Sequence, residues 1–477
     1  NGVVTSYFFS EDENDNELPP EARAADTSVT NSGLIRGDAG TGVGLTGGGS
    51  VTNSGTIQGF SGNVGNGAQG VGVAISEFAD RISEGVTGVG TIANSETGLI
   101  EGTTFGAVLQ GGGTIDNAGI IRSTGTPNPA TPGISPFGII LTASPDQVGR
   151  TATVNNNGTV SGFLGVLAGG SLDTAVINNS GTINAVTTAI FANLSGDLVV
   201  NNEAGGEIIS NGFIAINSAG GTLTLDNAGL VRSNANSAIR VGTAGASIAN
   251  SGTIAGGGSD GIYANADGVT VINNAEDGTI TGAASGIHAE LGGLELTNAG
   301  TIHGDGVNPG FDAPPDAGVT ISGGVSSVTN SGSITGNRFG ITTANYFNPA
   351  TGQLQGLATG TTVVNSGTIY GYSDDGVRLV GGGRGTNSGE IGGQITAFAD
   401  GVSMFAYTDQ ANEDYSALVT NEAEGRIIGV RFGVILSGGG EVLNDGEILG
   451  ASGGVYIQGT ALNTDPNEER SGLTANV

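Results

Sequence analysis

The stretch VTNSGTIQG, residues 51–59, decides the fold because the chain repeats it along most of its length. Close copies are VTNSGSITG at 328–336 and VVNSGTIYG at 363–371. Aligned as V-x-N-x-G-x-I-x-G, the phrase places an asparagine at sixteen positions. Ten of the fifteen spacings are 22 to 25 residues and five are 32 to 41. Such a period, with insertions between intact units, is typical of a solenoid. The asparagines are Asn31, Asn53, Asn94, Asn117, Asn156, Asn179, Asn202, Asn227, Asn250, Asn274, Asn298, Asn330, Asn365, Asn387, Asn421 and Asn444.

Each repeat carries a second phrase, seen as GVGLTGGG at 42–49, GAVLQGGG at 106–113 and GVRLVGGG at 376–383. Apolar residues alternate with period two in both phrases, which indicates strands with one buried face. Glycines and asparagines separate the strands where the chain must turn with positive φ. The sequence therefore predicts an all-β fold, a right-handed parallel β-helix of about sixteen coils of 22 to 25 residues with insertions at the corners.

In such a coil each side chain lies about 4.8 Å from its equivalent on the next coil. An asparagine at a turn can then bond its amide to the asparagines above and below, as in stacked β assemblies. The flanking Val, Ile and Leu stack into dry columns that no single repeat could bury alone. We therefore expect the sixteen asparagines to form a structural ladder.

Composition narrows the class of protein. The chain has 477 residues, of which 92 are glycine, 37% are hydrophobic and only 5% are aromatic. Its net charge is −31, and all 13 basic residues are arginine. Nucleic acid is excluded as a partner because a phosphate backbone binds basic surfaces. Solubility of a long β surface explains the acidity most simply, and calcium ligation by carboxylates remains an unassigned alternative.

Cysteine is absent, which excludes disulfides, thiolate zinc sites and cysteine nucleophiles. It also fits a secreted chain that crosses an outer membrane unfolded. The chain begins with Asn1 and its only methionine is Met404, which predicts a processed product or a fragment. No apolar run reaches the roughly 18 residues of a transmembrane helix.

The repeats predict three parts: an acidic arm or cap at 1–27, a β-helix at 28–460 and a degenerate cap or tail at 461–477. Insertions collect at two corners, as in residues 123–136 and 305–317 on one side and 345–361 and 407–417 on the other. Repeat proteins usually place recognition on such loops. The candidate partner-binding residues are Tyr346, Phe347, Phe405, Tyr407 and Tyr415.

The amino-terminal arm contains an alternating, aromatic segment tethered by the acidic stretch EDENDNELPPE. It could donate a strand to a neighbouring molecule, or it could fold back over its own first coil. The candidate assembly residues are Val3, Val4, Tyr7, Phe8 and Phe9.

The alternation of N-S-G-T-I-x-G with G-V-x-L-x-G-G-G, over roughly residues 28–460, resembles the passenger regions of bacterial autotransporter proteins. The resemblance implies a right-handed β-helix that is secreted through a carboxyl-terminal outer-membrane barrel and often acts as an adhesin. The sequence departs from that family pattern in showing no barrel strands after Val477, so the resemblance predicts a released or trimmed passenger. The same scaffold also carries proteases, lyases and purely structural rods.

Catalytic motifs are fragmentary. Polygalacturonase-like signatures appear only as Asn463-Thr464-Asp465, Asp374-Asp375 and His303-Gly304, in reverse order and several coils apart, with no lysine. A serine protease needs a histidine, and His288 and His303 both lie within repeat phrases at outward strand positions. The tripeptide Arg36–Asp38 matches an integrin-binding motif, but Arg36 is the variable residue of I-x-G.

These observations predict no enzyme and no cofactor. We expect an extracellular structural β-solenoid of a bacterial surface, with itself as partner in a filament or surface layer. The alternative is an adhesin that binds surface glycans or proteins through its corner loops. A polysaccharide-degrading β-helical enzyme is the remote alternative.

Overall fold

The computed structural model describes residues 2–4, 27–61, 70–76, 89–127, 135–145, 149–242, 244–306, 316–343, 346–348, 353–355, 358, 360–405 and 417–458. The chain divides into two compact units, Asn1–Ala235 and Asn236–Val477. Every regular element within the described ranges is a β-strand. No described helix could cross a membrane.

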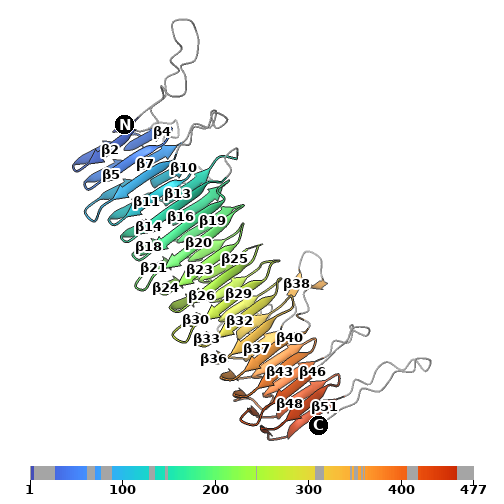
Figure 1. Ribbon diagram of the computed structural model, residues 1–477. Coiled ribbons are helices and arrows are strands. Elements are labelled where there is room, and N and C mark those ends of the chain that lie inside the picture. The colour runs from blue at the N-terminus through green and yellow to red at the C-terminus, as the bar shows by residue number, and fades with distance from the viewer. Residues whose placement is uncertain are drawn as a thin grey trace, which may run out of the picture. The chain divides into compact units, whose positions relative to one another are not determined.

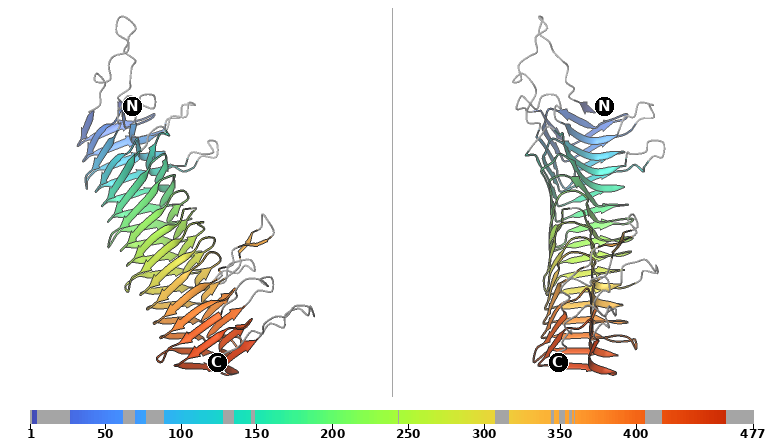
Figure 2. Two further views of the ribbon diagram at one scale, coloured as in Figure 1. Left: turned by 45° about the vertical axis from the view of Figure 1, so that its right-hand side comes forward. Right: turned by 90° about the vertical axis from the view of Figure 1, so that its right-hand side faces the viewer.

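Three parallel sheets form each unit, and the strands of each sheet lie side by side as successive rungs (Figures 1 and 2). We call them the asparagine sheet, whose strands mostly end at the ladder position, the isoleucine sheet, which carries T-I-x-G, and the valine sheet, which carries G-V-x-L. Each coil contributes one strand to each sheet. Each unit is thus a right-handed parallel β-helix, and the predicted fold class is confirmed.

In the first unit the asparagine sheet comprises β2 (Ser28–Asn31), β5 (Gly49–Asn53), β8 (Gly90–Asn94), β11 (Gly113–Asn117), β14 (Thr151–Asn156), β17 (Thr174–Asn179), β20 (Asp197–Asn202) and β23 (Leu223–Asn227). Its isoleucine sheet comprises β3 (Leu34–Gly37), β6 (Thr56–Gly59), β9 (Leu99–Gly102), β12 (Ile120–Ser123), β15 (Thr159–Gly162), β18 (Thr182–Ala185), β21 (Glu207–Ser210) and β24 (Leu230–Ser233). Its valine sheet comprises β1 (Val3–Val4), β4 (Val43–Thr46), β7 (Val71–Ser76), β10 (Phe105–Gln110), β13 (Phe137–Ala143), β16 (Leu164–Gly170), β19 (Ile190–Leu194) and β22 (Ile216–Ser218).

In the second unit the asparagine sheet comprises β26 (Ala246–Asn250), β29 (Thr270–Asn274), β32 (Leu294–Asn298), β35 (Ser327–Asn330), β40 (Thr361–Asn365), β43 (Gly383–Asn387), β46 (Ala417–Asn421) and β49 (Glu441–Asn444). Its isoleucine sheet comprises β27 (Thr253–Gly256), β30 (Thr279–Gly282), β33 (Thr301–Gly304), β36 (Ser333–Gly336), β41 (Thr368–Gly371), β44 (Glu390–Gly393), β47 (Arg426–Gly429) and β50 (Glu447–Gly450). Its valine sheet comprises β25 (Ile239–Val241), β28 (Ile262–Ala264), β31 (Ile287–Ala289), β34 (Ala317–Ile321), β37 (Phe339–Thr343), β42 (Val377–Val380), β45 (Val402–Phe405), β48 (Phe432–Ser437) and β51 (Gly453–Gln458).

Register between coils is set by the repeat itself. Across a long insertion β32 still pairs with β35 so that Asn298 lies beside Asn330. A slip of one residue would turn every inward side chain to the surface, so the aliphatic pattern holds the register. The insertions therefore leave the stack intact.

The core of each coil is a layer of inward aliphatic side chains, one set from each sheet. In the coil formed by β5, β6 and β7, the inward residues Val51, Ile57 and Val73 are fully buried. Stacking supplies this burial, since each layer is covered by the layers on either side.

Glycine is required at two kinds of turn. Gly111, Gly112 and Gly113 link the valine and asparagine sheets with φ of 109°, 88° and 122°, which strongly disfavours a residue with a Cβ. At the asparagine turn the coils approach too closely for a side chain: a Cβ on Gly55 would lie 2.2 Å from the carbonyl oxygen of Gly33. The repeated glycines of the sequence follow from these two constraints.

Only one described insertion has regular structure of its own. β38 (Tyr346–Asn348) and β39 (Gln353–Gln355) form a two-stranded antiparallel hairpin in the second unit. Figure 1 shows β38 standing apart from the strands of the three sheets. The predicted boundaries at 27/28 and 460/461 adjoin residues outside the described ranges.

Candidate functional site

The predicted asparagines lie in one column per unit, each at a turn between the asparagine and isoleucine sheets. In the first unit Asn53 Nδ2 donates to Asn94 Oδ1 at 2.8 Å, and Asn94 Nδ2 donates to Asn117 Oδ1 at 2.8 Å. In the second unit Asn250 Nδ2 donates to Asn274 Oδ1 at 2.8 Å, and Asn274 in turn to Asn298 at 2.8 Å. These amide–amide bonds all run from the Nδ2 of one asparagine to the Oδ1 of the asparagine on the next coil toward the carboxyl terminus.

Each amide also bonds to the backbone, as Asn274 illustrates. Its Nδ2 donates to the carbonyl oxygen of Gly278 in its own turn at 3.0 Å and lies 3.4 Å from that of Thr301 on the next coil. Its Oδ1 accepts from Asn250, so both ends of the amide have partners. Side chains bound in this way have no free polar atom for a ligand, which makes the column a structural element.

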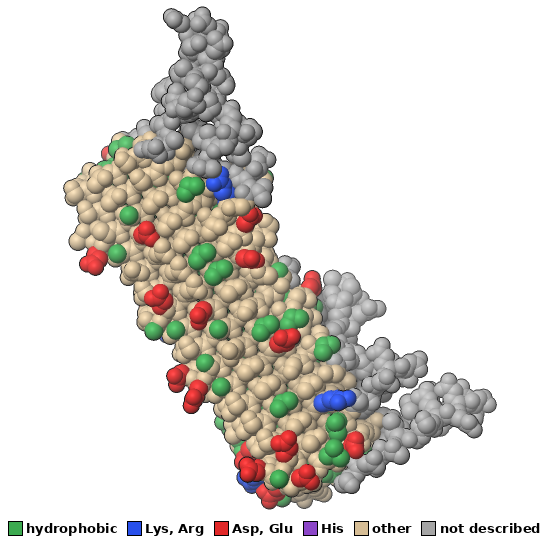
Figure 3. Space-filling view, in the orientation of Figure 1, with side chains coloured by type: hydrophobic (Ala, Val, Ile, Leu, Met, Phe, Trp, Pro, Cys, Tyr) green, Lys and Arg blue, Asp and Glu red, His purple; other side chains and the backbone are tan. Residues whose placement is uncertain are grey.

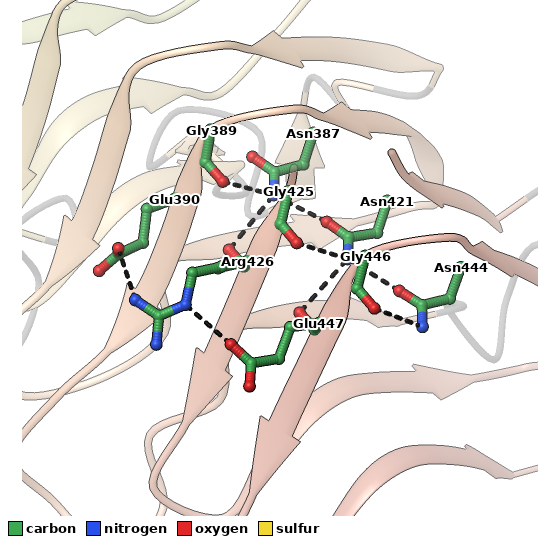
Figure 4. A network of polar contacts seen from close by, with 9 residues as sticks. All are labelled: Asn387, Gly389, Glu390, Asn421, Gly425, Arg426, Asn444, Gly446 and Glu447. Carbon is green, nitrogen blue, oxygen red and sulfur yellow. Dashed lines mark hydrogen bonds and ion pairs between the residues drawn. The ribbon is translucent and has the colours of Figure 1, made fainter. Parts of the chain in front are cut away.

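Figure 4 shows the column at the last coil of the second unit. Asn421 Nδ2 donates to Asn444 Oδ1 at 2.8 Å, whereas Asn444 Nδ2 donates to Gly446 of its own turn at 3.2 Å. Beside them Arg426 bonds Glu390 on one side and Glu447 on the other. These carboxylates raise the pKa of Arg426, through the hydrogen bond to Glu447 first. An exposed ion pair of this kind stabilises little.

The valine sheet of the second unit and the residues next to its strands carry a group of polar side chains, the His288 cluster: Asp260, Tyr263, His288, Glu290 and Ser322. Tyr263 is half-buried and the other four are buried. His288 follows Tyr263 in register on the next strand. Its Nε2 lies 3.3 Å from Ser322 Oγ, and its Nδ1 lies 3.8 Å from Asp260 Oδ2. The order carboxylate, imidazole, hydroxyl is that of a serine hydrolase.

Two features of the His288 cluster disfavour catalysis. Asp260, His288 and Ser322 are only 4%, 5% and 3% exposed, so a substrate has no route to the Ser322 hydroxyl. The carboxylate is also beyond hydrogen-bond distance of the imidazole, and His288 Nδ1 has no hydrogen-bond partner. This arrangement does not orient the imidazole as a general base.

Tyr263 closes the cluster on one side. Its hydroxyl donates to Glu290, and its ring centroid lies 5.3 Å from that of His288. Burial, and then the bond to Glu290, raises the pKa of Tyr263 above its ordinary value. The phenol therefore stays protonated and remains a hydrogen-bond donor.

A second set, the Asp375 cluster, comprises the buried residues Asp375, Asp400 and Ser403 and the half-buried Arg431. Ser403 donates to Asp375, whose other oxygen accepts from the Asp400 amide at 2.9 Å. Arg431 makes a bidentate pair with Asp400. Burial raises the pKa of Asp375 to about 7, because the Ser403 bond only partly offsets the loss of water. Among the described residues no guanidinium bonds Asp375 directly, so its carboxyl has no hydrogen-bonded cation to offset the burial.

Metal ligation finds no support among the described residues. Within those ranges no three His, Asp or Glu side chains are placed to hold an ion. On the face seen in Figure 3 the Asp and Glu side chains lie scattered, without one acidic patch. Calcium stays unassigned.

The candidate partner-binding residues lie in different places. Tyr346 and Phe347 are in β38, whose backbone alone is described. Phe405 ends β45 half-buried, with the guanidinium of Arg378 5.3 Å from its ring centroid. Tyr407 and Tyr415 lie outside the described residues.

The candidate assembly arm is described at two residues. Val3 and Val4 form β1, which pairs in parallel with β4 of the same chain, with Val3 beside Val43. These two residues therefore adopt the fold-back alternative. Tyr7, Phe8 and Phe9 lie outside the described residues.

The weaker motifs are engaged locally. Arg36 Nε bonds Asp38 at 2.5 Å, so the two charges of the integrin-like tripeptide face each other. His303 bonds Thr335 Oγ1 at 2.7 Å and Asp305 at 2.9 Å. Of the polygalacturonase-like fragments, Asn463-Thr464-Asp465 lies outside the described residues.

Neither a family model, nor a curated protein, nor a solved structure matches this chain. The site assignments therefore rest on the chain's own geometry.

The repeat phrases predict an outward strand position for His288, which is correct, but they do not predict its neighbours. Alignment of the second phrase across coils puts Tyr263, His288 and Thr320 in one column. That alignment could have located the cluster, although not its burial.

Proposed function

We propose that this chain is an extracellular, non-catalytic structural β-solenoid of a bacterial surface that associates with itself into a filament or surface layer. The observation that carries the proposal is the state of the core at the two end coils. Interior isoleucines such as Ile57 and Ile100 are fully buried, whereas Ile35 on β3 and Ile448 on β50 are only half-buried. Covering them is the gain that association offers.

Unpaired strand edges support the same proposal. At the first coil β2 and β3, and at the last coil β49, β50 and β51, have a paired neighbour on one side only among the described strands. Such edges readily pair with another chain. A contact between two different ends is heterologous, and it builds an open filament when it does not close.

The absence of catalysis is part of the proposal. The His288 cluster is the one described set of side chains whose order suggests nucleophilic chemistry, and its burial argues for a structural role. A catalytic serine must be reachable by its substrate.

The location at a bacterial surface rests on the resemblance to autotransporter passengers and on the absence of cysteine. A chain without thiols can pass an oxidising compartment without cross-linking.

The adhesin alternative is favoured by one observation, the hairpin of β38 and β39 that stands apart from the stack. A projecting loop on a rigid scaffold is a usual place for recognition. Removing residues 345–361 should then abolish attachment to a host or matrix surface and leave the β signal in circular dichroism intact. Unchanged attachment would count against this alternative.

The proposed self-association is tested by sedimentation velocity and electron microscopy of the purified chain over a range of concentrations, with and without calcium. We expect longer particles as the concentration rises. A single monodisperse species at the highest concentration in both conditions would refute the proposal.

A further inference from the structure

The asparagine column of each unit has a direction, and the first coil of the first unit and the last coil of the second unit end with complementary groups. Among the described residues, Asn31 Oδ1 at the first coil accepts from Gly33 N of its own turn alone, at 3.2 Å. Within the same described ranges, Asn444 Nδ2 at the last coil donates to Gly446 of its own turn alone. One end thus presents an acceptor and the other a donor. The ends fit each other and do not fit themselves.

Gly33 begins a column of glycines at the asparagine turn, but it lacks the close contact with a preceding coil that excludes a side chain from the later members. A Cβ on Gly55, Gly158 or Gly367 would lie 2.1 to 2.2 Å from the carbonyl oxygen of the glycine on the preceding coil. A Cβ on Gly33 would meet nothing within 4 Å, and its φ is not positive. Glycine is needed at this position only if another coil lies on the first one.

β1 occupies the place of a preceding coil on the valine sheet. A Cβ on Gly2 would lie 2.4 Å from Gly42 O and 2.5 Å from Ile35 Cγ2. Interior glycines meet the next coil in the same way: a Cβ on Gly72 would lie 2.8 Å from Ile100 Cγ2. β1 is therefore a short equivalent of the G-V-x-L strand, held by two residue pairs.

β51 is the corresponding strand of the valine sheet in the last coil, and among the described residues no coil follows it. Gly454 is the equivalent of Gly2 and of Gly433, and a Cβ on Gly433 would lie 2.3 Å from Ile448 Cγ2 of the following coil. A Cβ on Gly454 would meet only Ile448, at 3.1 Å or more. If the last coil of one molecule stacks on the first coil of another, β51 falls where β1 lies.

We propose that the chain associates head to tail, the last coil of one copy docking on the first coil of a second, with β51 displacing β1 from β4. The inference rests on the self-association proposed above and names its interface. Asn444 Nδ2 then donates to Asn31 Oδ1 of the second copy, and Ile448 and Ile35 become interior layers. β1 acts as a cap that competes with docking.

Strand length favours the exchange. β1 contributes two residue pairs to β4, whereas β51 pairs over five positions with β48 inside its own unit. The longer strand offers more ladder bonds and buries more side chain. The cap slows association without preventing it.

Four glycine-to-alanine variants of the full chain test the interface by sedimentation velocity. Gly2→Ala drives a Cβ into Gly42 and unseats β1, so the apparent dissociation constant should fall. Gly33→Ala and Gly454→Ala place a Cβ at the junction and should raise it by about tenfold or more. Gly385→Ala, whose Cβ would lie 3.6 Å from Met404 in ordinary contact, is the matched control and should behave as wild type.

The outcomes separate the two proposals. If wild type and Gly2→Ala both stay monomeric, self-association itself fails. If wild type associates and Gly33→Ala and Gly454→Ala associate equally well, this interface is wrong while self-association stands. If Gly454→Ala instead lowers the melting temperature of the monomer and leaves association unchanged, β51 is covered by the same chain, and the interface is again wrong.

Discussion

The asparagine column of the second unit and the ionisable clusters of its valine sheet are both buried and polar, but they meet the cost of burial differently. In the column each neutral amide bonds an identical amide on the next coil, so that the Nδ2 of one asparagine donates to the Oδ1 of the next. In the clusters the neighbours are unlike, and His288 Nδ1 has no hydrogen-bond partner.

Repetition of one residue on every coil gives each buried polar group a matching hydrogen-bond partner, which a single buried side chain does not have. A buried polar group costs free energy unless it is hydrogen-bonded, and a buried charge costs more. Asparagine stacks because one amide carries both a donor and an acceptor. The Asp375 carboxylate carries no donor of its own, and its burial raises its pKa.

The largest expected effect comes from a charge in the column. Asn274→Asp replaces the donor that bonds Asn298 and Gly278 with a carboxylate oxygen, so three oxygens face one another. We expect a loss of about 3 to 5 kcal/mol in the free energy of unfolding at pH 7, measured by chemical denaturation. The loss should shrink at acidic pH, where the protonated carboxyl can donate. Asn273→Asp, exposed on the same strand, is the control.

Removing the amide should cost less. Asn274→Ala leaves Asn250 without its acceptor and Asn298 without its donor, for an expected loss of about 1 to 3 kcal/mol. Asn444→Ala removes the bonds to Asn421 and Gly446. Because Asn444 is exposed, water can replace both bonds, and the expected loss is less than about 1 kcal/mol. Equal losses at the two positions would contradict stacking as the source of the stabilisation.

The Asp375 cluster should make stability depend on pH. A raised carboxyl pKa means that the folded chain holds the proton more tightly than the unfolded chain. The stabilisation is complete below the ordinary value of 3.8 and is lost as the pH rises through about 7. Asp375→Asn should remove this dependence and increase the free energy of unfolding at pH 8 by about 1 to 2 kcal/mol.

The control for that prediction is Asp277→Asn, an exposed carboxyl on a turn of the same unit. Thermal unfolding of both variants at pH 4, 6 and 8 gives the comparison. A wild-type stability that rises from pH 4 to pH 8, with the same slope in Asp375→Asn, would contradict the assignment.

The smallest effect is expected at Ser322. Ser322→Ala removes one 3.3 Å contact to His288, for a loss of about 1 kcal/mol or less in the free energy of unfolding. Hydrolysis of activated esters by the wild-type chain should equal that of the buffer blank. Activity that vanishes in Ser322→Ala would instead make the His288 cluster catalytic.

The coil could be predicted from the sequence because its information is local and repeated. The phrase V-x-N-x-G-x-I-x-G indicates which side chains point inward. The interval between two copies indicates which residue of the next coil each of these side chains stacks against. Asn298 and Asn330 are 32 residues apart and still pair, because the phrase itself aligns them. Sixteen copies of one pattern leave few alternative registers.

The strands, the inward columns and the asparagine positions thus follow from the amino-acid sequence alone. The burial of Asp260, His288 and Ser322 and the pairing of β1 with β4 are visible only in the folded chain. The physical reason is that inward packing follows from the period, whereas burial of an outward side chain depends on what covers it. Strand pairing by Val3 and Val4 likewise depends on the free edge of β4, which the sequence of residues 3 and 4 does not reveal.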